Sequence, residues 1–126
     1  MKQPDRKPTD AELAILRVLW SRGPSTVRDV AAAMDREGAY TTVLKLLQIM
    51  MDKQLVRRDE STRTHVYEAA HSEAQMQQHL VADLLDRAFD GSAATLVMRA
   101  LSAKKTSAKE LAEIRKLLES KQGERP

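Results

Sequence analysis

Hydrophobic and polar positions in the first 70 residues follow periods that predict three helices and then a β-hairpin. Apolar residues recur at helical spacing over residues 10–21, 27–34 and 40–53. Two short extended runs, 55–58 and 64–68, flank a polar turn, which is typical of a hairpin. This order predicts a mainly α fold with a winged helix-turn-helix, three helices plus a small β-hairpin wing, over residues 9–70.

Short motifs mark the ends of the first two helices. Thr9 and Glu12 have the spacing of a capping box directly before an apolar run, and Gly23-Pro24 is expected to end that helix. Thr26 can cap the second helix, with Asp29 at its third position. Residues 1–8 are polar and basic, and we expect a disordered leader there.

The rest of the chain predicts three more helices, over about residues 72–89, 93–101 and 107–120. Their apolar faces have no evident core to share with residues 1–70, and a second copy of the chain is the simplest partner. We therefore expect a C-terminal helical dimerisation domain over residues 71–126. The residues expected at the interface are Met76, Leu80, Leu84, Leu111, Ile114 and Leu118.

One polar edge runs along the predicted helix 40–53, whose opposite side is apolar. Short hydroxyls, an amide and a cation over a buried face are what a recognition helix places at base edges in the major groove. Thr41, Thr42, Lys45 and Gln48 are therefore candidate base-contacting residues, and Arg28, Tyr40, Arg63 and Thr64 are candidate contacts to the DNA backbone. Two alternatives remain open, a merely solvated helix face and a winged helix that serves as a protein-interaction adaptor.

Composition narrows the classes of function. The chain has 126 residues, no cysteine and a net charge of +3, so disulfide and thiolate chemistry are excluded and the charge is compatible with nucleic acid. No apolar run is long enough for membrane insertion, and the N-terminus lacks the apolar stretch of a signal peptide. A cytoplasmic protein is the expectation.

Nothing in the sequence predicts an enzyme, a cofactor or a metal site. His65, His71 and His79 are the histidines, and no metal-binding motif joins them, so they are interpreted as ordinary surface or strand residues. The carboxylates Asp59 and Glu60 lie in the predicted turn and are interpreted as solvated charges. No phosphate-binding glycine loop or nucleophile motif occurs.

Three segments of the sequence resemble the penicillinase repressor family (BlaI/MecI/CopY type). They are residues 9–20, residues 40–50, and residues 55–59 together with His65-Val66-Tyr67, and the resemblance extends over about residues 8–120. It implies a dimeric winged-helix repressor that binds a palindromic double-stranded DNA operator. It also implies a functional link to a membrane sensor metallopeptidase whose signal leads to cleavage of the repressor.

The chain departs from this family at three points. It lacks the paired cysteines of copper-responsive members, so that sensor is excluded. Arg99-Ala100 occupies the place of the Asn-Phe bond that is cut in β-lactam-responsive members. Gln54 follows the recognition helix where the family usually has glycine, which makes a left-handed turn there more costly.

Overall fold

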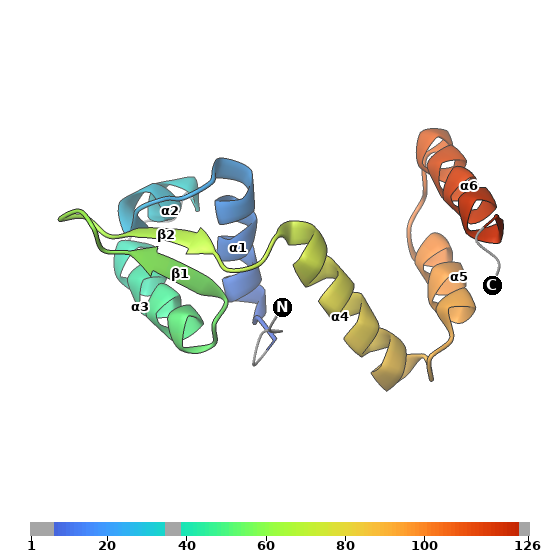
Figure 1. Ribbon diagram of the computed structural model, residues 1–126, viewed down its shortest axis with the longest axis horizontal. Helices are drawn as coiled ribbons and strands as arrows, with labels where there is room; N and C mark the ends of the chain where they lie inside the picture. Colours follow the sequence, from blue (N-terminus) through green and yellow to red (C-terminus); the bar gives the residue numbers. More distant parts are fainter. Residues whose placement is uncertain (1–6, 35–38, 124–126) are drawn as a thin grey trace. The chain divides into compact units, whose positions relative to one another are not determined.

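The computed structural model of the chain describes residues 7–34 and 39–123, and the chain forms two compact units that divide between Ala82 and Asp83 (Figure 1). Most of the expected leader, residues 1–6, lies outside the described residues. The helices and strands in chain order are α1 (Asp10–Arg22), α2 (Val27–Ala33), α3 (Ala39–Asp52), β1 (Val56–Asp59), β2 (Val66–Ala69), α4 (Glu73–Ala88), α5 (Ala93–Ala103) and α6 (Ala108–Gln122).

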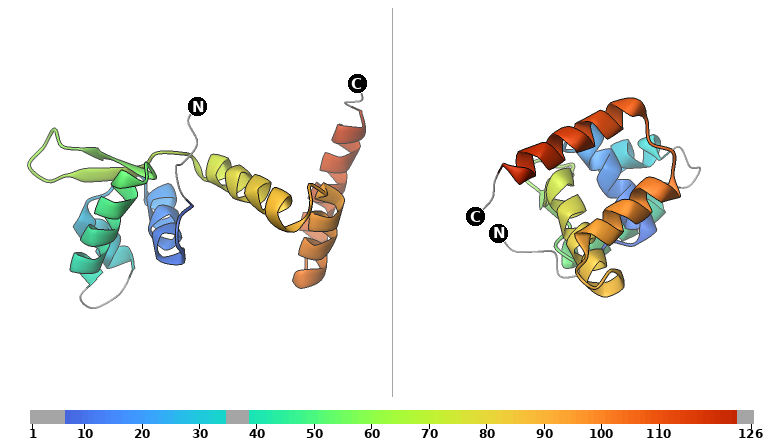
Figure 2. Two further views of the ribbon diagram at one scale, coloured as in Figure 1. Left: turned by 90° about the horizontal axis from the view of Figure 1, so that it is seen from below. Right: turned by 90° about the vertical axis from the view of Figure 1, so that its right-hand side faces the viewer.

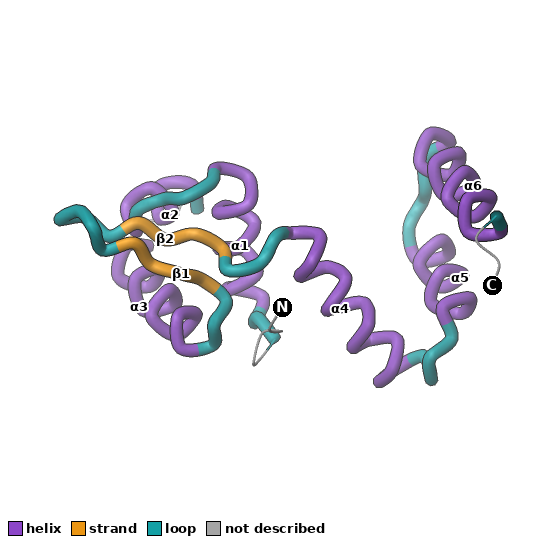
Figure 3. Tube along the Cα trace, in the orientation of Figure 1, coloured by secondary structure: helices purple, strands orange, loops and turns teal. Residues whose placement is uncertain are grey.

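The predicted fold class is confirmed. Three helices are followed by an antiparallel hairpin in which Val56 pairs with Ala69 and Asp59 with Val66 (Figure 3). We call this hairpin, residues 56–69, the wing. Its turn projects beyond the helices of the first unit (Figure 2, left). Isoleucine, leucine, valine and methionine side chains of α1, α2 and α3 form the core between these helices and the hairpin.

The capping box predicted at Thr9 is present, and the predicted cap Thr26 forms a capping box with Asp29 as well. The backbone N–H of Glu12 donates to Thr9 Oγ1 over 3.2 Å, and the Thr9 N–H donates to Glu12 Oε1 over 2.9 Å. At α2, the Asp29 N–H donates to Thr26 Oγ1 over 3.1 Å and the Thr26 N–H to Asp29 Oδ2 over 3.3 Å. These bonds satisfy N–H groups that a helix start leaves without partners, and so fix where α1 and α2 begin.

A buried ion pair joins α1 to the end of α3. Lys53 Nζ lies 2.7 Å from Glu12 Oε1, and the two side chains are only 12% and 2% exposed. Burial alone would raise the pKa of Glu12, but the hydrogen bonds from Lys53 and from the Thr9 backbone, together with the Lys53 charge, outweigh it and hold this pKa below its ordinary value. One carboxylate thus caps α1 and neutralises a cation from α3.

The turn after α3 has left-handed backbone geometry at Gln54, a conformation that is costly for a residue other than glycine. Gln54 has a φ of 63°, and its N–H donates to the Met51 carbonyl while the Leu55 N–H donates to the Met50 carbonyl. This is the hydrogen-bond pattern of a Schellman motif with glutamine in the usual glycine position. Leu55 and Met50 are both fully buried, which supplies the apolar contact that accompanies the motif. The turn therefore forms in spite of Gln54.

The base of the wing is tied to the start of α2. Tyr67 on β2 exchanges two backbone hydrogen bonds with Ser25, of 2.7 and 2.9 Å, in the loop between α1 and α2. Gly23 begins that loop with a φ of 86°, which a side chain would make unfavourable. Ser25 and Tyr67 are both buried. The wing is thus fixed at its base beside the first residues of α2.

Met76, one of the residues expected at a dimer interface, belongs instead to the core of the first unit, and Leu80 packs against that core. Met76 is 1% exposed and lies in the same core cluster as Leu16 and Leu47, and Leu80 is half-buried against that cluster. The prediction for Met76 is therefore wrong, because its side chain is already covered within the protomer. The start of α4 completes the winged helix, and the division between the units falls inside α4 rather than after residue 70.

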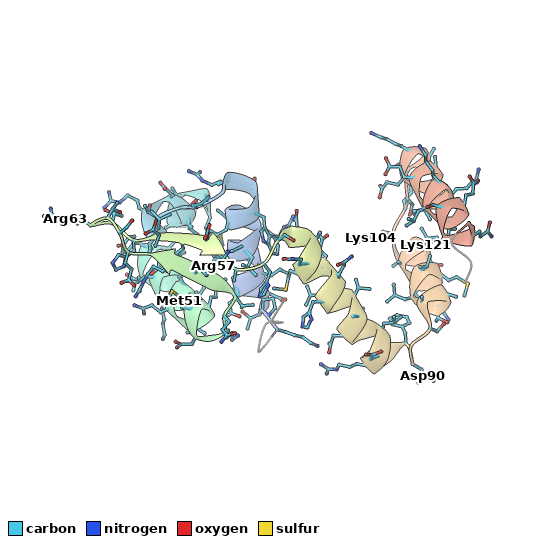
Figure 4. All side chains as sticks on the ribbon, in the orientation of Figure 1. Met51, Arg57, Arg63, Asp90, Lys104 and Lys121 are labelled. Carbon is cyan, nitrogen blue, oxygen red and sulfur yellow. The ribbon has the colours of Figure 1, made fainter. Side chains whose placement is uncertain are left out.

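The second unit has no buried side chain in α5 or α6. Ser92 and Ser107 cap these helices by accepting from the N–H groups of Thr95 and Glu110. Asp90, labelled in Figure 4, and Gly91 both have positive φ and make the turn between α4 and α5. Among residues 7–34 and 39–123, no helix is long and apolar enough to cross a membrane.

We expect the Glu12–Lys53 pair to make stability depend on pH in the acid range. Because the folded-state pKa of Glu12 lies below the ordinary 4.5, the pair contributes stability above about pH 4.5, and this contribution is lost as the pH falls through the folded value. In Lys53→Met the carboxylate stays buried without its cation, so the loss should be about 3–5 kcal/mol near neutral pH and should shrink in acid.

Urea unfolding followed by circular dichroism at several pH values measures this, with Glu12→Gln as the matched variant that has no charge to titrate. A loss in Lys53→Met that is equal at all pH values would show that the ion pair does not carry the effect.

Candidate nucleic-acid interface

The predicted polar edge of α3 is exposed. Thr41, Thr42, Lys45 and Gln48 all lie on the solvent side of the helix. The opposite side packs into the core through Val43, Leu47 and Met50, each at most 3% exposed. The helix is thus held by its apolar face, while its polar edge is available to an external ligand.

A groove beside α3 gathers residues from three separate parts of the chain. It has a volume of about 540 Å³. It lies between the start of α2, the start of α3 and the wing. Its lining residues are Thr26, Val27, Arg28, Tyr40, Leu44, Arg63, Thr64, His65 and Tyr67. The four residues predicted to hold the DNA backbone, Arg28, Tyr40, Arg63 and Thr64, are among them, so the fold brings this predicted set together.

The cations at this face have no acidic partner. Within the described part of the chain, the side chains of Arg28, Lys45 and Arg63 make no ion pair and no hydrogen bond. All three are exposed. Among the residues that the structure describes, these three cations are therefore not neutralised by a neighbouring carboxylate.

Other arginines of the wing are paired. Arg57 Nε lies 3.7 Å from Glu68 Oε1, across the two strands. Arg58 Nη2 lies 3.2 Å from Glu60 Oε1, and the hydrogen bond with the Tyr67 side chain raises the pKa of Arg58. Neither arginine lines the groove. Arg57 and Arg58 of the hairpin are thus each paired with a carboxylate, whereas Arg63 has no such partner among the described residues.

Local hydrogen bonds shape the turn that carries Arg63. The Ser61 N–H donates to Asp59 Oδ1 over 2.9 Å, and this bond lowers the pKa of Asp59. Thr62 Oγ1 donates to the Thr64 carbonyl over 2.7 Å. Figure 4 shows Arg63 at the far end of the turn, directed away from the helices. Its position suits a contact to a phosphate better than the reading of a base edge.

Five residues that line the groove were not named from the sequence as DNA contacts: Thr26, Val27, Leu44, His65 and Tyr67. Leu44 belongs to the apolar pattern of α3, which in the sequence indicates only burial. For His65, the sequence feature that could have indicated a place in the groove is its position at the start of the second extended run, next to Arg63 and Thr64. Within residues 7–34 and 39–123, no group of three acidic, cysteine or histidine side chains could hold a metal ion.

The predicted dimer residues of the helical tail are accessible. Leu84, Leu111 and Leu118 are 48%, 43% and 56% exposed, and Ile114 is half-buried. Four more large apolar side chains, not named from the sequence as interface residues, are exposed on α5 and α6: Val97, Met98, Leu101 and Leu117. Together with the predicted interface residues, these side chains give α5 and α6 an exposed apolar surface.

Comparisons with known proteins agree on the family. The family model described as penicillinase repressor matches residues 8–120. Two proteins named "Transcriptional regulator BlaI", from Mycobacterium tuberculosis strains CDC 1551 / Oshkosh and ATCC 25618 / H37Rv, are 39% identical to this chain over 84 residues. That match covers 64% of this chain and 61% of each relative, less than two thirds of their length.

Solved structures with a similar course of the chain have low sequence identity to it. A mutant of ZitR from Lactococcus lactis has a TM-score of 0.47 and 20% identity, over 98% of this chain and 80% of that chain. The Adhesin competence repressor (AdcR) from Streptococcus pyogenes has a TM-score of 0.42 and 20% identity, over 90% and 79%. The family match spans both the winged helix and the helical tail, and the chain belongs to the penicillinase repressor family.

Proposed function

We propose that this chain is a dimeric transcriptional repressor that binds a palindromic operator through its winged helix. The observation that carries the proposal is the joint exposure of the α3 edge and of unpaired cations in the groove beside it. A recognition helix needs its first turns at base edges and cations on the flanking phosphates. Membership of the penicillinase repressor family and the names of the two relatives support the same function.

The residues divide into two roles. Thr41, Thr42, Lys45 and Gln48 contact base edges from α3, where lysine suits guanine and glutamine suits adenine. Arg28 and Tyr40 hold one stretch of the backbone from the starts of α2 and α3, and Arg63 and Thr64 hold another from the wing. The first set determines sequence preference, whereas the second determines affinity and register.

Dimerisation occurs through the helical tail. The large apolar side chains of α5 and α6 are exposed in the protomer, and no side chain in these two helices is buried. Burying one such side chain is worth roughly 1.5–3 kcal/mol, so several per protomer can sustain a dimer. A second copy of the chain presents the same apolar surface and is the partner we propose.

Relief of repression depends on a signal from a membrane sensor metallopeptidase. The chain contains no asparagine, so no Asn-Phe bond exists. Arg99 and Ala100 occupy the matching place on α5 and are both exposed. Proteolytic relief therefore uses a different bond in this chain.

We expect Lys45→Ala and Arg63→Ala to weaken DNA binding in different ways. Loss of a base contact by Lys45 should cost about 1–3 kcal/mol per half-site and relax sequence preference. Loss of a phosphate contact by Arg63 should weaken all duplexes alike and lower the slope of log K against log salt by about one unit per contact. Fluorescence anisotropy with the upstream region of the gene and with scrambled DNA, at several salt concentrations, measures both effects.

The matched control is Arg57→Ala, because Arg57 lies in the same wing, is paired with Glu68 and does not line the groove. It should leave binding nearly unchanged. A folded Lys45→Ala protein with unaltered affinity and preference would overturn the role of α3 and favour the protein-interaction adaptor.

We expect the pair of changes Leu111→Glu and Leu118→Glu to give a monomer, because they place charges on the exposed apolar face of α6. Lys116→Glu, an exposed position on the other side of α6, should remain dimeric. Met76→Ala should lose about 2–5 kcal/mol of stability but should also remain dimeric, since Met76 is buried in the first unit. Sedimentation at micromolar concentration tests all three, and a monomeric parent chain would overturn the proposal.

We expect the repressor, when produced together with its sensor metallopeptidase and the inducing signal, to be cut at a bond other than Asn-Phe. Intact mass spectrometry of the recovered protein locates the cut. Release of the full-length chain from DNA under induction would contradict proteolytic relief and point to a change that leaves the chain whole.

A further inference from the structure

His65 lies in the groove between the wing and the recognition helix, although the sequence suggests no role for it. It lines the groove together with Arg28, Tyr40, Arg63 and Thr64. Its side chain is 42% exposed, so it is accessible to a ligand in the groove. Its neighbours in the chain, Arg63 and Thr64, are those proposed above to hold the DNA backbone.

Charged side chains from α2 and from the wing line the same groove as this imidazole or lie beside it. Arg28 of α2 and Arg63 of the wing turn line the groove together with His65. From the β1 side of the turn, Glu60 Oε1 lies 3.7 Å from His65 Nε2 and is also held by Arg58 at 3.2 Å. The remaining titratable group in the groove besides the buried Tyr67 is the Tyr40 hydroxyl of α3.

We propose that His65 is a phosphate-binding residue of the wing and that it binds DNA in its protonated form, so that DNA binding takes up a proton at this side chain. This inference rests on the proposed function, because the ligand is the phosphodiester backbone of the duplex. It adds a residue to the backbone contacts and a dependence on pH that the other contacts do not have.

The charges around the groove favour the uptake of a proton by His65 when DNA binds. In the protein alone, Glu60, the carboxylate that the described residues place beside His65, is already engaged by Arg58, while Arg28 and Arg63 add positive charge to the groove. A phosphate in the groove adds negative charge within reach of the imidazole and stabilises its protonated form. A protonated His65 also offsets the negative charge of Glu60, which would otherwise repel the phosphate.

Histidine is the side chain whose unperturbed charge changes between pH 5 and 8, whereas arginine, tyrosine and carboxylates keep theirs there. The groove contains no second histidine among its lining residues. A proton taken up here makes affinity rise as pH falls.

The test measures the Kd of the full-length chain for a duplex of about 30 base pairs from the upstream region of its gene, and for a scrambled duplex, between about pH 6 and about pH 8. Affinity for both duplexes should rise roughly tenfold on going to the lower pH, because a phosphate contact is independent of sequence. The slope of log K against log salt should grow by about one unit per protomer.

Three variants isolate the residue. His65→Gln should bind more weakly at low pH and lose most of the pH dependence. His65→Lys should bind at high pH about as well as the parent chain binds at low pH, again with little pH dependence. His79→Gln, on α4 and outside the groove, is the matched control and should behave as the parent chain does.

The outcomes separate this inference from the function on which it rests. Binding with an equal pH dependence in the parent chain and in His65→Gln would overturn the role of His65 and leave the repressor intact. Absence of binding to either duplex at every pH and salt concentration would overturn the repressor itself, and this inference with it.

Discussion

The position of α3 depends on one buried carboxylate. Glu12 is 2% exposed, and a charge this deep is tolerated only when it is paired and hydrogen-bonded. It satisfies both requirements by accepting from the Thr9 N–H at the start of α1 and from Lys53 just beyond the end of α3. The two helices can therefore adopt few other relative positions. The pair thus holds the end of α3 against the start of α1, and the polar edge of α3 remains exposed.

Much of the first unit could be predicted because its signals are local. Capping boxes at Thr9 and Thr26, and the regular apolar spacing of α3, each depend on residues within a few positions of one another. The groove was predicted only as a set of candidate residues, because Arg28, Tyr40 and Arg63 meet through the tertiary packing. Their meeting depends on the Ser25–Tyr67 backbone pair, for which neither residue type gives a signal. His65 was missed for the same reason.

On α4, hydrophobic periodicity predicts which residues share an apolar face but not which surface covers each of them. Met76, Leu80 and Leu84 recur at one spacing on α4, and the sequence predicted the same partner for all three. In the structure Met76 is 1% exposed, Leu80 is half-buried against the core and Leu84 is 48% exposed. A period tells that a face is buried but not which surface covers it. The partner of each of these three residues can be assigned only with the first unit in view, because its core already covers Met76 and part of Leu80.

Net charge was an equally incomplete guide, since +3 spread over the chain would not by itself indicate a nucleic-acid ligand. What matters is which cations the fold leaves unpaired. Lys53, Arg57 and Arg58 are held by Glu12, Glu68 and Glu60. Asp29 is engaged at the α2 cap and Asp59 in the wing turn. With these acids occupied, Arg28 and Arg63 in the groove and Lys45 on the exposed edge of α3 have no carboxylate partner among the described residues. The fold thus makes a locally cationic surface from a nearly balanced sequence.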